Sequence, residues 1–160
     1  MRSRIAFPLL ALLAAGGCSG TDATGPTSHD AGQSSPEAAV VGISFEKWFT
    51  TAPTMTGNTS LGAGTFAGTI TKRIVFDNGV IVQLGAIYQV TDPSGDHSFT
   101  AAIEGTENLQ TASAVLNGVV TAGWRVGARV HVTFEIIRPC ALAIGPSSIG
   151  VCFQGTIRIQ

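Results

Sequence analysis

Four polar residues near the C-terminus have the residue types that acid–base or anion-binding chemistry would need: Arg129, His131, Glu135 and Arg158. On a helix, His131 and Glu135 would meet. The surrounding residues alternate as in a strand, where positions four apart lie roughly 13 Å from each other and cannot pair directly. If this polar face points inward, it lines a polar cavity. If it points outward, its residues are solvated, and the apolar residues alternating with them favour this second interpretation.

A second candidate group lies earlier in the chain and consists of Asp96, His97 and Glu104. Asp96 and His97 fall in an expected turn, where such residues are commonly just solvated. Trp48 and Trp124 could contact carbohydrate or lipid, but core or barrel-end positions are more usual for such residues. No Gly-x-Ser-x-Gly motif is present, so nothing indicates a serine hydrolase of that type.

The N-terminus has the pattern of a secretory signal, with Arg2 and Arg4 before an apolar run over residues 5–15. The run ends in Ala15-Gly16-Gly17-Cys18, which resembles the lipobox of bacterial lipoproteins, although leucine is commoner than alanine at position 15. The resemblance implies cleavage after residue 17 and acylation of Cys18. It also implies membrane anchoring in the bacterial cell envelope, and Ser19 favours the outer membrane.

The segment over residues 18–39 is predicted to be a flexible linker that follows the lipidated cysteine. It is rich in Ser, Thr, Gly, Asp and Pro and has no large apolar residue, so it cannot bury enough surface to order itself. The single folded domain is therefore expected over residues 40–160.

The two remaining cysteines, Cys140 and Cys152, flank a loop that contains Gly, Pro and Ser. With Cys18 assigned to lipid by the lipobox resemblance, they form the one intramolecular pair that remains. An oxidising envelope favours a structural disulfide, and the absence of CxxC spacing disfavours a redox or metal site.

The folded segment contains one period-two run after another and no convincing amphipathic helix. Residues 65–76 and 80–90 flank Asp77-Asn78-Gly79 and predict a hairpin. In the first run we expect Phe66, Ile70, Ile74 and Phe76 on the buried face, with Arg73 opposite. In the run over residues 129–136, we expect Phe134 to be buried and His131 to be exposed.

These patterns predict an all-β, mostly antiparallel domain of about seven to nine strands, either a small barrel or a β-sandwich. Glycines inside the strand-like runs favour the barrel, because they permit bulges and sharp bends. Gly123, Trp124 and the segment Gly127-Ala128-Arg129 resemble part of the allene oxide cyclase and dirigent-type barrels. That resemblance implies a central cavity for small apolar substrates, but no catalytic residue of that group is matched.

Composition limits the range of functions. Charged residues make up 12% of the chain, and the absence of a basic run gives no support for nucleic-acid binding. No cofactor or metal motif is apparent. We therefore expect a non-enzymatic binding or structural module, whose partner is a protein, a polymer or a small apolar ligand. The alternatives are a carrier of small apolar ligands and a cyclase- or isomerase-like barrel, and an open cavity would favour them.

Overall fold

The computed structural model describes residues 39–76, 78–141 and 145–160. Cys18, the expected signal over residues 1–17 and nearly all of the expected linker lie outside these residues. Within the described part of the chain, no helix is long and apolar enough to cross a membrane. The strands are β1 (Val41–Thr51), β2 (Thr54–Thr59), β3 (Thr65–Val75), β4 (Ile81–Thr91), β5 (Phe99–Asn108), β6 (Ser113–Gly123), β7 (Arg129–Ile137) and β8 (Cys152–Ile159).

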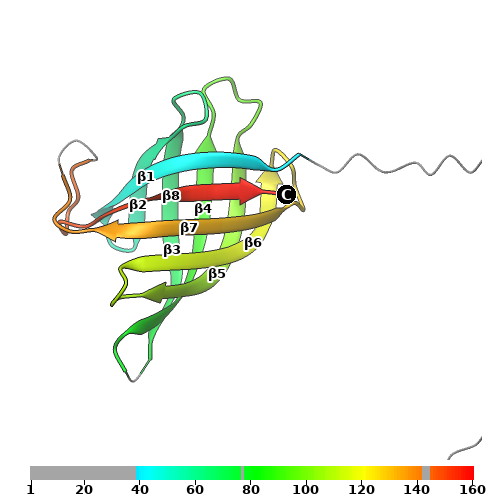
Figure 1. The fold of residues 1–160 in the computed structure, drawn as a ribbon. Helices are drawn as coiled ribbons and strands as arrows, with labels where there is room; N and C mark the ends of the chain where they lie inside the picture. The colour runs from blue at the N-terminus through cyan, green and yellow to red at the C-terminus, as the bar shows by residue number, and fades with distance from the viewer. Residues whose placement is uncertain (1–38, 77, 142–144) are drawn as a thin grey trace, which may run out of the picture. The chain divides into compact units, whose positions relative to one another are not determined.

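All eight strands form one closed antiparallel barrel in which each strand pairs with its neighbour in sequence. Closure comes from β8, which pairs with β7 on one side and with β1 on the other. Figure 1 shows β8, in red, between β1 and β7. The prediction of a small antiparallel barrel is confirmed, and the sandwich alternative is wrong because the first and last strands join.

Every second side chain along a strand points into the barrel and helps to fill its interior, as the period-two pattern predicted. In β7, Phe134 retains 5% of its exposure, and the neighbours on its face are also buried. In β4 the buried side chains lie at every second position from Val82 to Val90. The hairpin between β3 and β4 is confirmed, and Gly79 occupies the left-handed region at φ 64°.

The expected faces of β3 are wrong beyond Ile70. The pairing with β4 shifts between Ile70 and Lys72, so one extra residue is accommodated there and the side-chain alternation reverses. Arg73 then pairs with Leu84 and takes the inward direction, whereas Ile74 points outward and is 47% exposed. Phe76, beyond the end of the strand, is also exposed.

Glycine allows neighbouring strands to approach closely at two paired positions of β5 and β6. A Cβ at Gly118 would overlap the carbonyl oxygen of Ala102, and a Cβ at Gly105 would overlap that of Val115. These glycines permit the close strand contacts that a small, tightly curved barrel needs.

The predicted disulfide is confirmed between Cys140 and Cys152, whose Cα atoms lie 5.0 Å apart. Cys152 is the first residue of β8, and Cys140 lies just after the end of β7. The bond therefore fastens the base of the loop that joins these two strands.

Candidate functional site

One end of the barrel opens into a cavity of about 480 Å³. Its rim comes from the β1–β2 turn, the end of β3, the β5–β6 turn and the β7–β8 loop. The wall below the rim is mainly apolar and includes Met55, Leu84, Ala86 and Leu116. Both its size and its apolar lining are typical of a small-molecule site.

The cavity contains a buried amine, Lys47 of β1, which is 1% exposed. Five aromatic rings surround its Nζ at distances of 4.2 to 5.5 Å from the ring centroids: Phe45, Phe66, Tyr88, Phe134 and Phe153. We call Lys47 and these five residues the aromatic cage. Among the described residues, no carboxylate lies within ion-pair distance of this amine. The protein therefore holds a lysine in its interior without a direct counter-charge.

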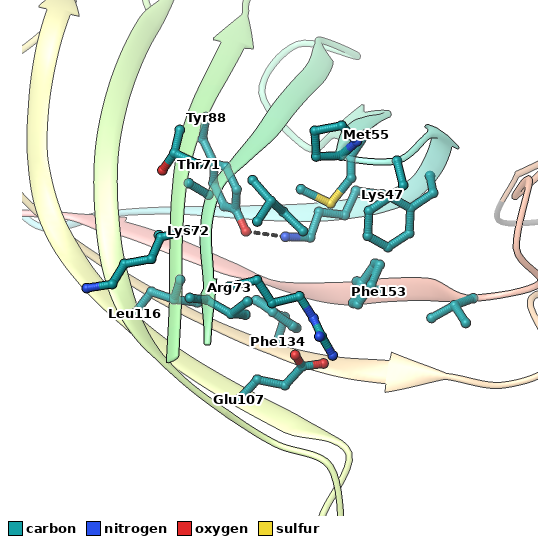
Figure 2. Close-up of a pocket in the computed structure, with 18 of the residues that line it drawn as sticks. Lys47, Met55, Thr71, Lys72, Arg73, Tyr88, Glu107, Leu116, Phe134 and Phe153 are labelled. Carbon is teal, nitrogen blue, oxygen red and sulfur yellow. Dashed lines mark hydrogen bonds between the residues drawn. The ribbon is translucent and has the colours of Figure 1, made fainter. Parts of the chain in front are cut away.

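Lys47 Nζ donates a hydrogen bond to the hydroxyl of Tyr88, which is also buried (Figure 2). Burial lowers the pKa of Lys47 well below its ordinary value, and the negative charge of Glu107 only partly opposes this. Burial, and then Glu107, raise the pKa of Tyr88. At neutral pH the cavity therefore has a protonated phenol beside an amine that is readily deprotonated.

An ionisable group also lies nearer the mouth. Glu107, from the end of β5, is 8% exposed, and its burial raises its pKa, while Arg73, Arg138 and Lys47 act in the opposite direction. Figure 2 shows the guanidinium of Arg73 pointing toward the Glu107 carboxylate. Arg73 and Arg138 are exposed, so the rim has positive charge while the cavity wall remains apolar.

The polar group expected near the C-terminus lies elsewhere, on the outer face of β7 and β8. Arg129, Glu135 and Arg158 are exposed. His131 lies on the same outer face, but it is half-buried and not exposed as expected, because it packs beside Asn117 of β6. His131 pairs across the sheet with Arg158, and its Nδ1 lies 2.8 Å from Oδ1 of Asn117. None of the four residues lines the cavity.

The structure does not bring the second expected group together. Asp96 and His97 lie between β4 and β5 at the opposite end of the barrel, whereas Glu104 lies midway along β5 and pairs with Gly85. His97 pairs with Asp92 at 3.0 Å, while Asp96 and Glu104 are exposed. Hydrogen bonds from Ser94, and to a smaller extent from His97, lower the pKa of Asp92. The ring of His97 meets Trp124 edge-on, with centroids 4.7 Å apart. Trp124 therefore covers this end of the barrel and does not reach the cavity.

Sequence reasoning missed Lys47 and Glu107, although a signal for each was present. Val41, Ile43 and Phe45 alternate toward the interior, and the next position of that series is Lys47. Glu107 continues the inward series of β5 that includes Phe99, Ala101 and Ile103. A charged residue at an inward position of a strand was thus the informative departure from the pattern.

In the part of the chain that the structure describes, no three His, Cys, Asp or Glu side chains gather closely enough to hold a metal ion. Comparisons with protein-family models, with curated proteins and with solved structures give no match, so the cavity's own chemistry carries the functional argument.

Proposed function

We propose that the barrel is a binding module for a small, largely apolar ligand that carries an oxygen acceptor. The observation that carries this proposal is an open cavity of about 480 Å³ in which an amine and a phenol converge within an otherwise apolar wall. A hydrocarbon body fits the wall, and a carbonyl, carboxyl or hydroxyl oxygen fits the N–H and O–H donors of Lys47 and Tyr88.

A purely structural module would gain nothing from such an interior. A buried amine without a counter-charge costs stability, and a methionine in its place would fill similar space without that cost. The rim also has Arg73 and Arg138, whose positive charge attracts an electronegative ligand end before it enters.

We further propose that the module is anchored in the bacterial cell envelope through acylated Cys18, with a flexible linker before the barrel. The lipobox-like Ala15-Gly16-Gly17-Cys18 supports the anchor. Outer-membrane sorting is part of the same proposal and follows from Ser19. A ligand with an apolar body would partition into such a membrane and so be concentrated close to the module.

The binding proposal is tested with N-phenyl-1-naphthylamine, an uncharged dye whose fluorescence rises in apolar surroundings. We expect the purified protein to bind the dye and medium-length alcohols, aldehydes and carboxylic acids to displace it. The variant Ala86→Leu, which adds volume to the cavity wall, should weaken dye binding by about tenfold or more, since overfilled space excludes a ligand.

The matched control is Ile87→Leu, at the next position of β4 on the outer, exposed face. It should bind the dye as the unmodified protein does. Equal binding by Ala86→Leu, with its fold intact by circular dichroism, would place the dye outside the cavity and contradict the proposal.

A further inference from the structure

We propose that Lys47 is a nucleophilic amine that captures aldehydes or ketones in the cavity as imines on its Nζ. The proposal rests on the binding function above and deepens it, because it names the ligand class as carbonyl compounds with an apolar body. It assigns to the barrel a reversible covalent step in addition to simple binding.

The position of the amine is the first argument. Lys47 lines the cavity, and its Nζ lies in the aromatic cage, where no described carboxylate pairs with it. Burial without a counter-charge lowers the pKa of this amine and so favours its neutral form, which is the nucleophilic one. The other lysine of the chain, Lys72, is half-buried at the rim, and Figure 2 shows its ammonium group pointing away from Tyr88.

The hydrogen bond to Tyr88 is the second argument. Because Lys47 donates an N–H to the phenol oxygen, its lone pair remains free for a carbonyl carbon. The phenol proton is in turn free to be donated. Tyr88 remains protonated at neutral pH and can therefore act as the acid that the carbonyl oxygen needs.

The step balances without any oxidant or reductant. The Lys47 lone pair forms the N–C bond, and the C=O π electrons move to oxygen, which takes the Tyr88 proton. The amine nitrogen then returns a proton to the phenolate, giving a neutral carbinolamine. The nitrogen lone pair then forms the C=N bond as the C–O bond breaks, and the departing hydroxyl takes the Tyr88 proton and leaves as water. The products are a protonated imine on Nζ and the Tyr88 phenolate, so charge and atoms balance.

The aromatic cage suits the product as well as the reactant. A protonated imine carries positive charge, and the five rings within 5.5 Å of Nζ attract a cation through their faces. The same rings limit access of water to the C=N bond. Hydrolysis is thereby slowed but not prevented, and release of the ligand remains possible.

The test uses the purified full chain, cinnamaldehyde and sodium cyanoborohydride at pH 7, followed by peptide mapping of the labelled lysines. The hydride donor converts each imine to a stable secondary amine. With two lysines in the chain, Lys72 is an internal control. We expect Lys47 to be labelled at least about tenfold faster than Lys72, because more of it is the neutral amine. Equal labelling, or faster labelling of Lys72, would overturn the proposal.

Two comparisons separate reactivity from simple exposure. In guanidinium chloride the two lysines should react at similar rates, because their difference in reactivity depends on the folded structure. Tyr88→Phe keeps the ring but removes the acid, and it should slow labelling of Lys47 by about 100-fold while leaving Lys72 unchanged. An unchanged rate at Lys47 in this variant would contradict the role of Tyr88.

Failure of this proposal can be told from failure of the binding function. Cinnamyl alcohol has the same skeleton but no carbonyl carbon for the amine to attack. If it displaces N-phenyl-1-naphthylamine while cinnamaldehyde leaves Lys47 unlabelled, the imine step is wrong and the binding function stands. If the alcohol does not displace the dye and no label forms, both proposals are wrong.

Discussion

Replacing Lys47 by methionine should change how the stability of the barrel depends on pH. Methionine has a similar length and no charge, so the variant keeps the packing of the aromatic cage and removes the one titrating amine inside it. The pKa of Lys47 is lowered in the folded protein from an ordinary value of 10.5, chiefly by burial.

Whether stability rises or falls with pH depends on which state, folded or unfolded, binds more protons. Between the lowered folded pKa and 10.5, the unfolded chain holds a proton on Lys47 that the folded chain does not hold. The free energy of unfolding of the unmodified protein should therefore rise with pH throughout this window. The contribution is at most about 1.4 kcal/mol per pH unit, and thus at most about 3 kcal/mol between pH 7.5 and 9.5.

Other groups set the limits of the experiment. Tyr88 has a raised pKa in the folded protein, so it lowers stability as pH rises past its ordinary value of 10.0. Measurements should therefore stop at pH 9.5. Removing the amine also leaves the Tyr88 hydroxyl without its partner, at a cost of about 1–3 kcal/mol that does not vary with pH. The slope, rather than the absolute stability, is the informative quantity.

The assay is urea denaturation followed by circular dichroism at pH 7.5, 8.5 and 9.5. The unmodified protein should show the steeper increase, and Lys47→Met should be nearly flat. The same slope in both proteins would show that Lys47 keeps its proton on folding. In that case the cage would hold an ammonium ion, and our account of its chemistry would be refuted.

Three further predictions concern the core, the disulfide and the anchor. Phe134→Ala should lower the free energy of unfolding by roughly 3–5 kcal/mol and His131→Ala by less than about 0.5 kcal/mol, in urea titrations; the reverse order would mean that the outer face of β7 matters more than the core. Reducing the Cys140–Cys152 bond, which spans 12 residues, should remove roughly 3 kcal/mol and lower the melting temperature by about 10 °C; an unchanged melting temperature would contradict this. Cys18→Ser should abolish membrane partitioning and leave unprocessed precursor, whereas an intact mass without acyl groups for the unmodified protein would exclude the anchor.

Much of the fold was predictable because period two is a strong signal when one face of each strand is buried. The alternation over residues 129–136 correctly predicted which side chains of β7 point inward and which point outward. Asn78-Gly79 correctly predicted the hairpin between β3 and β4. The bulge after Ile70 was missed, although the three consecutive polar residues Thr71-Lys72-Arg73 interrupt the alternation there. Ile74 and Phe76 then resume an apolar series at the same even positions, which concealed the shift in register. Barrel closure itself depends on pairing between β1 and β8, which no local pattern encodes.

The site was harder to find than the fold because a cavity is defined by strands that are distant in sequence. Lys47, Tyr88 and Glu107 lie on β1, β4 and β5, and each has unremarkable neighbours along the chain. Their convergence appears only when the sheet closes. The polar residues that the sequence singled out as candidates, such as His131, alternate with buried apolar residues because they lie on the outer face of the barrel.

The position of β8 in the closed sheet has a consequence for biosynthesis. Until this strand, Cys152–Ile159, pairs with both β7 and β1, the sheet has two open edges, and each presents unpaired N–H and C=O groups that another chain can join. Closure also requires contact between residues more than 100 positions apart, which makes barrel formation slow relative to hairpin formation. Early oxidation of Cys140 and Cys152 would hold β8 beside β7 and leave one remaining seam to close. The order of oxidation and strand pairing thus sets how long aggregation-prone edges persist.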